Sequence, residues 1–560
     1  MTDALALGVD AERLTLAAYV EDIAGRFADR EAMVFEGDHL TYADLLARSR
    51  ALAKSLIAAG VSKGTKVAIL VASRPEFVVA SFATSLAGGV IVPVSTLATR
   101  EEREHILCHS DSAVLVTQHH LRRHEYVADL AGHHPSLLSG CPGRLADPAF
   151  PFLRRVVVLG DTSGTAEGWD EFLALGSDVP DSLLDAAARQ VTPADDGIII
   201  YTSGTTAVPK AVLHAHRSVT VQMWRWAQLL ELESSDRVWS AYPFFWTAGF
   251  AMYIGGTLSS GATLVMQEVF DAAGALELIE RERATTVMAF EHTAAQLANH
   301  PDAHRRDLSS LRNLGKSSSL RAIIGPGDHW DPQAGYGSSE TFTVSCALPS
   351  RTPDHIRSHT HGPPLPGMEV RIVDPDTGEP LPTGQTGEIV VRGISLMRGY
   401  YKLPLEDAFD GGGWFHSNDA GYLNEQGFLH WSGRISGLIK TAGANVSPVE
   451  VENRAAGLKM LGVTCAVGIP HPTLGEAVVL AGIPLEDVKY EEDRFLAYLR
   501  EHLASYKVPK RVLLFSEGEL DFTSSDKVRT DQARRLIIER LIATDTDKDW
   551  VRYLRSLSGR

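Results

Sequence analysis

Hydrophobic and polar residues alternate along the first part of the chain with two periods, one typical of helices and one typical of strands. Residues 41–59 carry apolar side chains at helical spacing, which predicts an amphipathic helix. Residues 66–71 form an apolar run that predicts a buried strand, and a second helix is expected from Pro75 onward. Residues 89–94 predict another strand. Alternating strands and helices favour a parallel sheet with helices on both faces.

Three long stretches depart from this alternation. Residues 121–165 are rich in glycine, proline and histidine, and we interpret them as a loop region. Residues 78–99 and 238–267 contain no charged side chain, but glycine and proline interrupt both runs. We therefore expect these two runs to form buried core and not to span a membrane.

Length and composition narrow the class of protein. A chain of 560 residues is too long for one hydrophobic core, so two or more domains are expected. The formal net charge of −17 argues against a broad contact with nucleic acid or an anionic membrane. The 4 cysteines are scattered without a C-x-x-C pair, which favours a reducing, cytoplasmic setting over a zinc site or a disulfide framework. The acidic N-terminus lacks the pattern of a signal peptide.

One stretch combines a strand with a loop suited to phosphate. The β-branched run that starts at Ile198 is followed by hydroxyl side chains, a glycine, a proline and Lys210. Hydroxyls, backbone N–H groups and an ammonium group are what a loop needs to hold a polyphosphate. The loop does not match G-x-x-x-x-G-K-[ST], so that motif is excluded. The alternative interpretation is an ordinary solvated turn. The loop residues in question are Thr202, Ser203, Gly204, Thr205 and Thr206.

This stretch resembles the phosphate loop of the adenylate-forming superfamily, whose pattern is approximately T-S-G-T-T-G-x-P-K-G. The superfamily includes acyl-CoA synthetases, aryl-CoA ligases, luciferases and adenylation domains, and this chain is most similar to an acyl-CoA synthetase. Alanine stands at two of the pattern's glycine positions, Ala207 and Ala211. At least six motifs follow in family order between about Leu40 and Lys527.

The resemblance implies a binding site for ATP and Mg²⁺. The segment Y-G-S-S-E at 336–340 is similar to the family's Y-G-x-T-E, which implies that the tyrosine stacks on adenine, the hydroxyl touches the α-phosphate and the glutamate binds magnesium. Mg²⁺ prefers one or two carboxylates together with phosphate oxygens. Asp419 occupies the position of the ribose-binding aspartate, and Arg434 that of a ribose or phosphate donor. The nucleotide residues implied after the loop are Lys210, Tyr336, Gly337, Ser339, Glu340, Asp419 and Arg434.

The resemblance also places the acyl substrate. Residues 242–249 align with the family's P-x-F-H-x-x-G segment, and Trp246 stands where histidine is common. Amino-acid-activating relatives place an aspartate here, because a buried ammonium without a partner is costly. Its absence favours a hydrophobic acid without an amine: aryl, polycyclic or medium-to-long acyl. An ordinary core strand and helix would explain the same apolar run. The expected substrate-binding residues are Phe245, Trp246, Gly249 and Ser318.

A small domain is expected to carry the last motifs. The segment 433–440 resembles the family's G-R-x-x-D-x-I-K, which implies a hinge at Ser436 and coenzyme A contacts at Lys440 and Gly443. Lys527 falls on the catalytic lysine, although Asp526 replaces the usual glycine. The expected domains are a large AMP-binding domain at 1–433, a small domain at 434–545 and a charged helical tail at 546–560.

The predicted fold class is α/β: a large N-terminal domain of doubly wound sheets with a small β-barrel lobe, and a small mobile α+β C-terminal domain. The implied reaction joins a carboxylic acid to AMP with release of pyrophosphate, and the thiol of coenzyme A then displaces AMP. Two alternatives stay open: transfer to a carrier protein or separate partner, and a catalytically weak acyl- or nucleotide-binding pseudoenzyme. The oligomeric state is open, with a homodimer as one option.

Overall fold

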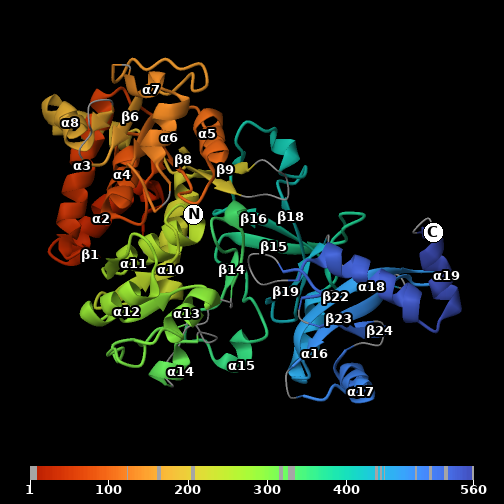
Figure 1. The fold of residues 1–560 in the computed structure, drawn as a ribbon. Coiled ribbons are helices and arrows are strands. Elements are labelled where there is room, and N and C mark those ends of the chain that lie inside the picture. The colour runs from red at the N-terminus through yellow and green to blue at the C-terminus, as the bar shows by residue number, and fades with distance from the viewer. Residues whose placement is uncertain are drawn as a thin grey trace. The chain divides into compact units, whose positions relative to one another are not determined.

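The protein is described from a computed structural model, and its chain divides into two compact units (Figure 1). The first unit contains Met1–Glu369 and Val391–Phe415, and the second contains Val370–Val390 and His416–Arg560. The two units are described separately below. The residues that the structure describes are 9–122, 124–139, 141–160, 166–202, 209–314, 319–325, 335–435, 439–441, 444–446, 448–485, 488–503, 507–516, 518–522 and 528–557.

An eight-stranded sheet forms one half of the first unit. Strands β8, β4, β3, β5, β6 and β7 pair in parallel, whereas β9 is antiparallel to both β8 and β17. The predictions of a strand at 66–71, a strand at 89–94 and a parallel sheet are thereby confirmed. In sheet order the strands are β17 (Gly399–Tyr400), β9 (Lys210–Ala215), β8 (Asp196–Thr202), β4 (Val90–Pro93), β3 (Lys66–Leu70), β5 (Ser112–Thr117), β6 (Arg155–Val158) and β7 (Glu167–Gly168).

Two helices that the sequence predicts lie between these strands. Helix α3 (Tyr42–Ala58) begins with a capping box, in which Thr41 Oγ1 accepts from the Asp44 N–H and Asp44 Oδ2 accepts from the Thr41 N–H. Helix α4 (Pro75–Leu86) begins with proline, which has no N–H to leave without a partner in the first turn. Residues 78–94 of the uncharged run lie in α4, in β4 and in the short segments next to them and are buried, as expected, whereas Leu97 near the end of the run is 66% exposed.

The interpretation of 121–165 as a loop region is wrong in part. Helices α6 (Tyr126–His133) and α7 (Ser136–Ser139) lie in this segment, and β6 adds a parallel strand to the sheet. Tyr126 and Leu130 are spaced i, i+4 and pack in the core beside β5. The burial of these apolar side chains outweighs the local turn signals, because tertiary packing routinely overrides propensity.

A five-stranded sheet forms the other half of the first unit. All neighbours in it pair in parallel except β1 and β2, which are antiparallel. Trp239, Val265 and Met33 on its central strands are fully buried. In sheet order the strands are β12 (Thr286–Met288), β10 (Arg237–Ser240), β11 (Thr263–Met266), β1 (Glu31–Phe35) and β2 (Asp38–Thr41).

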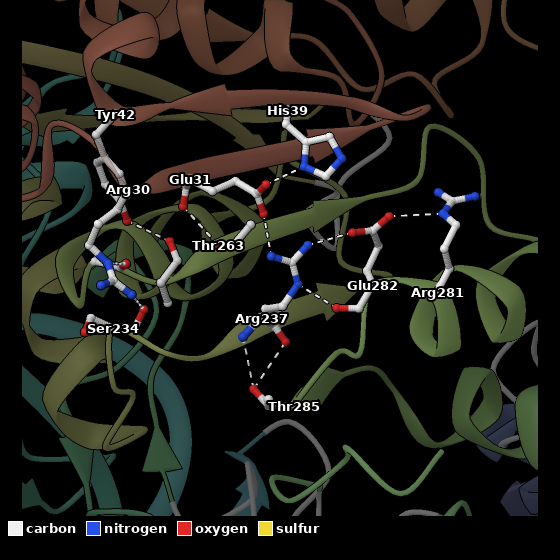
Figure 2. Close-up of polar contacts among 12 residues, drawn as sticks. Arg30, Glu31, His39, Tyr42, Ser234, Arg237, Thr263, Arg281, Glu282 and Thr285 are labelled. Atoms are coloured by element: carbon white, nitrogen blue, oxygen red, sulfur yellow. Dashed lines mark hydrogen bonds and ion pairs between the residues drawn. The ribbon is translucent and has the colours of Figure 1, made fainter. Parts of the chain in front are cut away.

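A polar network joins the amino ends of these strands, and Figure 2 shows Arg237 between two carboxylates. Its guanidinium pairs with Glu31, and it donates to Glu282 Oε2 at 2.6 Å and to the Glu282 carbonyl oxygen at 2.5 Å. Thr285 Oγ1 accepts from the Arg237 N–H, and Thr263 Oγ1 donates to the Glu31 carbonyl. The network therefore links the first residues of β1, β10 and β11 to Thr285, which directly precedes β12.

The second unit contains most of a four-stranded sheet and a five-stranded sheet with helices. The first of these lies in the segment predicted as a β-barrel lobe. Its strands are β15 (Met368–Val373), β16 (Gly387–Gly393), β18 (Phe415–Leu423) and β19 (Leu429–Arg434). The second sheet contains β21 (Ala444–Val446), β20 (Ile439–Thr441), β23 (Gly475–Pro484), β22 (Leu461–His471) and β24 (Arg511–Leu514). The helices are α16 (Pro448–Gly457), α17 (Glu492–His502), α18 (Thr530–Thr544) and α19 (Lys548–Leu557).

Helix α19 lies in the predicted tail and packs into the core of the second unit. Trp550 is almost fully buried, and its indole N–H donates to the Pro470 carbonyl at 2.7 Å. The predicted boundary between 433 and 434 falls at the end of β19, inside the second unit, and the three-domain division stays a prediction. Across the described ranges of the chain, none of the helices has the length and apolar character needed to cross a membrane.

Candidate active site

Two residues of the predicted phosphate loop lie side by side on neighbouring strands. Thr202 is the last residue of β8 and pairs with Lys210, the first residue of β9. Directly paired residues of antiparallel strands point to the same face of a sheet, so the hydroxyl and the ammonium group share one face. Ala211 is an extended strand residue buried in the core, so the methyl group at this glycine position of the family pattern is accommodated. The predicted loop residues Ser203, Gly204, Thr205 and Thr206, and also Ala207, lie outside the described residues.

Tyr400 brings Lys210 and Glu340 together. Its hydroxyl donates to Glu340 Oε1 at 2.9 Å, and the Lys210 Nζ lies 4.7 Å from the centroid of its ring. The Met397 N–H donates to the Glu340 carbonyl at 2.7 Å, which fixes the backbone at this position. A carboxylate held by a neutral hydroxyl keeps its negative charge available for a cation. One carboxylate beside bound phosphate is the donor set that Mg²⁺ prefers, so the residues present fit this ion.

The turn that carries Glu340 has a backbone that restricts its sequence. A Cβ atom at Gly337 would lie 2.0 Å from the Thr343 carbonyl oxygen, so only glycine fits there. Thr343 has φ +104° and Phe342 has φ +47°, a region that such side chains rarely adopt. Gln222 holds the strained segment through its amide, which donates to the Thr341 and Val344 carbonyls at 2.9 and 2.6 Å. The strained turn is therefore stabilised by hydrogen bonds from Gln222, a residue distant in sequence.

The other residues of this turn are placed as follows. Tyr336 lies in β13 (Gly335–Tyr336), pairs with Cys346 and is largely buried. Ser339 is bound through its carbonyl oxygen, which lies 2.8 Å from His214 Nε2. Burial lowers the pKa of His214 to about 4, so its imidazole is neutral at pH 7. We assign the proton to Nε2, because the partner is a carbonyl acceptor.

The predicted ribose residues face each other in the second unit. Asp419 and Arg434 are direct partners in the ladder of β18 and β19, and Arg434 Nε lies 3.1 Å from Asp419 Oδ1. The aspartate is buried, whereas the side chain of Arg434 is 62% exposed. Asn418 occupies the glycine position of the family's T-G-D pattern and has φ +56°. Asparagine tolerates this left-handed conformation better than most residues, which explains the substitution.

An aromatic pair lies beyond the carboxyl ends of β10 and β12. Trp246 follows β10 and Phe290 follows β12, and their ring centroids are 5.9 Å apart. Their exposed fractions are 40% and 42%, although Phe245 beside them is buried. The backbone at Gly249 lies so close to that of Pro243 that only glycine fits, because a Cβ atom there would lie 1.9 Å from the Pro243 carbonyl oxygen. Gly249 lies in a π-helix, Ala248–Gly255, a form found frequently at functional sites.

The uncharged run 238–267 contains buried core residues and also one exposed aromatic ring. Phe244 and Phe250 are core residues, whereas Trp246 presents its ring to solvent. Some predicted residues cannot be placed. Ser318, Ser436, Gly443 and Lys527 lie outside the described residues, and of Lys440 only the backbone, in β20, is described.

Sequence reasoning assigned no role to four residues of this region: Tyr400, His214, Gln222 and Phe290. His214 could have been found from the alternation along β9, where it shares a face with Lys210. Tyr400 lies within a family motif, but its sequence does not show that it contacts Glu340. Phe290 lies in the short segment after β12, far in sequence from Trp246.

The chain is similar to known proteins in both sequence and fold. Residues 20–401 match the model of a family described as AMP-binding enzyme. Feruloyl-CoA synthase from Amycolatopsis sp. is 31% identical over 515 residues, which is 89% of this chain and 94% of that protein. The putative acyl-CoA synthetase YngI from Bacillus subtilis is 29% identical over 538 residues, covering 94% and 97%.

Among solved structures, apo MatB from Rhodopseudomonas palustris has a TM-score of 0.75 at 23% identity and covers 94% of this chain and 99% of its own, which shows the shared fold. The amide bond synthetase McbA from Marinactinospora thermotolerans has a TM-score of 0.72 at 27% identity, with 93% and 99% covered. The chain therefore belongs to the AMP-binding enzyme family, within the adenylate-forming superfamily, and is acyl-CoA synthetase-like.

Proposed function

We propose that this protein is an AMP-forming acid–thiol ligase that activates a hydrophobic carboxylic acid with ATP and transfers it to coenzyme A. The observation that carries the proposal is the position of Tyr400, which holds the Glu340 carboxylate and lies beneath the Lys210 ammonium. Lys210 and Glu340 are far apart in sequence. Their contacts with the same tyrosine place a carboxylate that can bind Mg²⁺ near an ammonium group that can bind phosphate.

The first half-reaction requires cations that offset the negative charges of the carboxylate and the triphosphate. It requires no general base. The substrate carboxylate is already ionised at pH 7 and repels the triphosphate. Its oxygen forms a bond to the α-phosphorus as the bond to pyrophosphate breaks, and pyrophosphate leaves with the electron pair. Lys210 offsets the developing charge, while Thr202 and the loop hydroxyls orient the phosphates. Mg²⁺ on Glu340 would supply further charge neutralisation.

Three of the remaining motif residues, and the side chain of a fourth, Lys440, lie outside the described part of the chain. We assign Lys527 to the adenylation step, Ser436 to the hinge, and Lys440 and Gly443 to coenzyme A, on the family motifs alone. In the second half-reaction, the thiol sulfur of coenzyme A bonds to the acyl carbon of the acyl-adenylate. AMP leaves with the electron pair, and the thiol proton is released. The small domain at 434–545 would have to move between the two steps.

Asp419 and Arg434 are proposed to hold the ribose. Asp419 has two carboxylate oxygens, one of which contacts Arg434, and an ionised carboxylate accepts hydrogen bonds from hydroxyl donors. The buried position of the aspartate makes such hydrogen bonds stronger than in water. Tyr336, Gly337 and Ser339 are proposed to contact adenine and the α-phosphate.

The acid is proposed to be apolar, with aryl acids as its favoured members. The half-exposed rings of Trp246 and Phe290 provide a surface on which a flat apolar group can pack. Among the relatives are a feruloyl-CoA synthase and an indoleacetate–CoA ligase, whose names specify aryl-containing acids. Transfer to a carrier protein and a pseudoenzyme are not favoured by relatives named as CoA ligases.

The test is ATP–pyrophosphate exchange over a panel of acids, followed by an assay of thioester formation with coenzyme A. We expect exchange with aryl or other apolar acids, thioester formation with coenzyme A, and loss of exchange in Lys527→Ala with ATP affinity largely retained. Exchange without consumption of coenzyme A would support the carrier-protein alternative. No exchange with any acid would support the pseudoenzyme.

We also propose a cytoplasmic location, with a homodimer as one option for the oligomeric state. The support for the location is that all four cysteines are free: Cys108 and Cys141 are exposed, and Cys346 and Cys465 are buried. Free, exposed thiols persist in a reducing compartment.

A further inference from the structure

The edge of the eight-stranded sheet presents different side chains on its two faces. On one face lie Thr202, Lys210 and Tyr400, because Thr202 pairs with Lys210 and the Lys210 ammonium lies over the Tyr400 ring. Successive residues of a strand point to opposite faces. Tyr201 and Tyr401 therefore lie on the other face, where both pack against the core that contains Ala211. Each tyrosine is the sequence neighbour of a residue that we assign to the ATP site.

Helix α5 (Arg100–His109) holds the first of these tyrosines. The Nδ1 atom of His109, its last residue, lies 2.9 Å from the Tyr201 hydroxyl oxygen. The ring of His105, one turn earlier, stacks on His109 with centroids 5.3 Å apart. Burial raises the pKa of Tyr201, and burial, His105 and Lys402 together lower the pKa of His109. Tyr201 is therefore the donor, and the neutral imidazole accepts through Nδ1.

The turn after α5 holds the second tyrosine. The Tyr401 hydroxyl donates to Asp111 Oδ2 at 2.9 Å, and Lys402 Nζ donates to Asp111 Oδ1 at 2.8 Å. Asp111 and Lys402 each lie in a turn with left-handed backbone, with φ +55° and φ +63°. The Asp111 carboxylate therefore joins the turn after α5 to the turn after β17. The ring of Tyr401 also lies 5.9 Å from that of His109, which links the two contacts.

These contacts lie where the sheet itself offers little support. Strand β17 has two residues and lies at the edge of the sheet, where Gly399 and Tyr400 pair with β9 and the Arg398 and Tyr401 N–H groups donate to β9 carbonyls at 2.7 and 2.8 Å. Backbone hydrogen bonds over such a short edge strand resist displacement poorly. On the other face of the sheet, the hydrogen bond of Tyr201 to His109 would restrain the end of β8. The hydrogen bond of Tyr401 to Asp111 would restrain β17.

We propose that His109 and Asp111 are positioning residues for the ATP site, acting through Tyr201 and Tyr401. They hold the ends of β8 and β17 so that Thr202, Lys210 and Tyr400 keep the geometry that binds phosphate. This inference rests on the proposed function for the identity of the ligand. It assigns a role to the end of α5, which contacts Tyr201, Tyr401 and Lys402.

The test removes the two hydroxyls without removing the rings. We expect Tyr201→Phe and Tyr401→Phe each to weaken ATP binding about three- to tenfold, the size of one lost hydrogen bond. The double variant should weaken it further. Calorimetry with ATP alone gives the affinity, and steady-state kinetics should show a raised KM for ATP with the KM for the acid unchanged. Tyr42→Phe is the matched control, because its buried hydroxyl donates to the Ala262 carbonyl at the other sheet.

The histidine allows a rescue experiment. His109→Leu removes the acceptor and should weaken ATP binding to the same extent as Tyr201→Phe. His109→Asn places a carbonyl oxygen close to the position of Nδ1 and should restore most of the affinity. The inference is overturned if the two tyrosine variants lower the melting temperature like Tyr42→Phe but leave ATP affinity at the wild-type value. It is also overturned if His109→Asn and His109→Leu bind ATP equally.

The two proposals can fail separately. Failure of the wild-type protein to activate any acid would contradict the proposed function. The ratio of ATP affinities between variant and wild type needs neither an acid nor coenzyme A, so it tests the positioning role by itself.

Discussion

The two ends of the parallel strands in the five-stranded sheet carry opposite kinds of side chain. At the amino ends, the Arg237 guanidinium lies between the carboxylates of Glu31 and Glu282, which in turn contact His39 and Arg281 (Figure 2). Beyond the carboxyl ends, Trp246 and Phe290 present uncharged rings that are about two-fifths exposed.

The difference indicates which end is available to a ligand. At the amino ends, each charge of the network has an opposite charge from the protein itself, so its contribution is to stability. At the carboxyl ends, apolar area stays in contact with water until something covers it, and exposed aromatic surface commonly marks a binding site. Open α/β sheets bind their ligands outside the carboxyl ends of the strands, as this distribution predicts.

The strongest test breaks the amino-end network. Arg237→Met removes the cation that lies between Glu31 and Glu282 and leaves Glu282 only its half-exposed partner Arg281, although the Glu282 side chain is only 8% exposed. We expect the free energy of unfolding to fall by about 3 kcal/mol, less than for a fully buried pair because Arg237 and Glu31 are a quarter exposed. Chemical denaturation measures this loss. Acid preference should stay as in the wild type.

Arg281→Met is the matched control for that variant. Arg281 pairs with the same Glu282, but half of its side chain is exposed. Its loss should cost no more than about 1 kcal/mol. Equal destabilisation by the two variants would contradict a special role for Arg237.

The second test addresses the carboxyl ends. Trp246→Ala should change the ratio of kcat/KM between an aryl acid and a short-chain acid by about 10- to 100-fold, because a large apolar contact is lost. The KM for ATP should change little. Phe152→Ala, at an aromatic residue that is 53% exposed elsewhere in the first unit, is the control. An unchanged acid preference in Trp246→Ala would remove the assignment of this region to the acid.

A third test examines a polar group that is buried without an opposite charge. Burial lowers the pKa of His214 to about 4 from 6.5, so the unfolded chain takes up the proton at higher pH than the folded chain. The neutral imidazole therefore contributes stability that is fully present above pH 6.5 and is lost as the pH falls towards 4. At pH 5 the loss is about 2 kcal/mol.

His214→Gln keeps an N–H donor for the Ser339 carbonyl but does not titrate. We expect its stability to fall less than that of the wild type between pH 7 and pH 5, as measured by denaturation at both values. The control is His133→Gln, at an exposed histidine, which should retain the wild-type pH dependence. Identical pH dependence in His214→Gln and the wild type would contradict the lowered pKa.

The smallest expected effect concerns the carboxylate of the site. Tyr400→Phe removes the hydroxyl that donates to Glu340 and keeps the ring beneath Lys210. We expect about a three- to tenfold change in the Mg²⁺ concentration for half-maximal activity, the net effect of one typical hydrogen bond, with little change in stability. Tyr126→Phe, whose hydroxyl donates to the Thr96 carbonyl, is the control. A Mg²⁺ response equal to that of the wild type would contradict a role of Tyr400 at the proposed Mg²⁺ site.

The sequence by itself determined the class of the fold and the family. The strand at 66–71 and the helix at 41–59 follow from apolar periods, because local spacing decides which backbone conformation buries an apolar face. The order of the motifs identified the adenylate-forming superfamily. The residues assigned from motifs alone, among them Lys527 and Ser436, stay predictions.

Only the tertiary structure decided which of these residues meet. No local pattern shows that Tyr400 binds Glu340, that Phe290 lies beside Trp246 or that Arg237 lies between Glu31 and Glu282. The physical reason is that each contact depends on which strands pair and in which register. A period of two assigns a side chain to a face, but the neighbour on that face comes from a strand far away in the sequence.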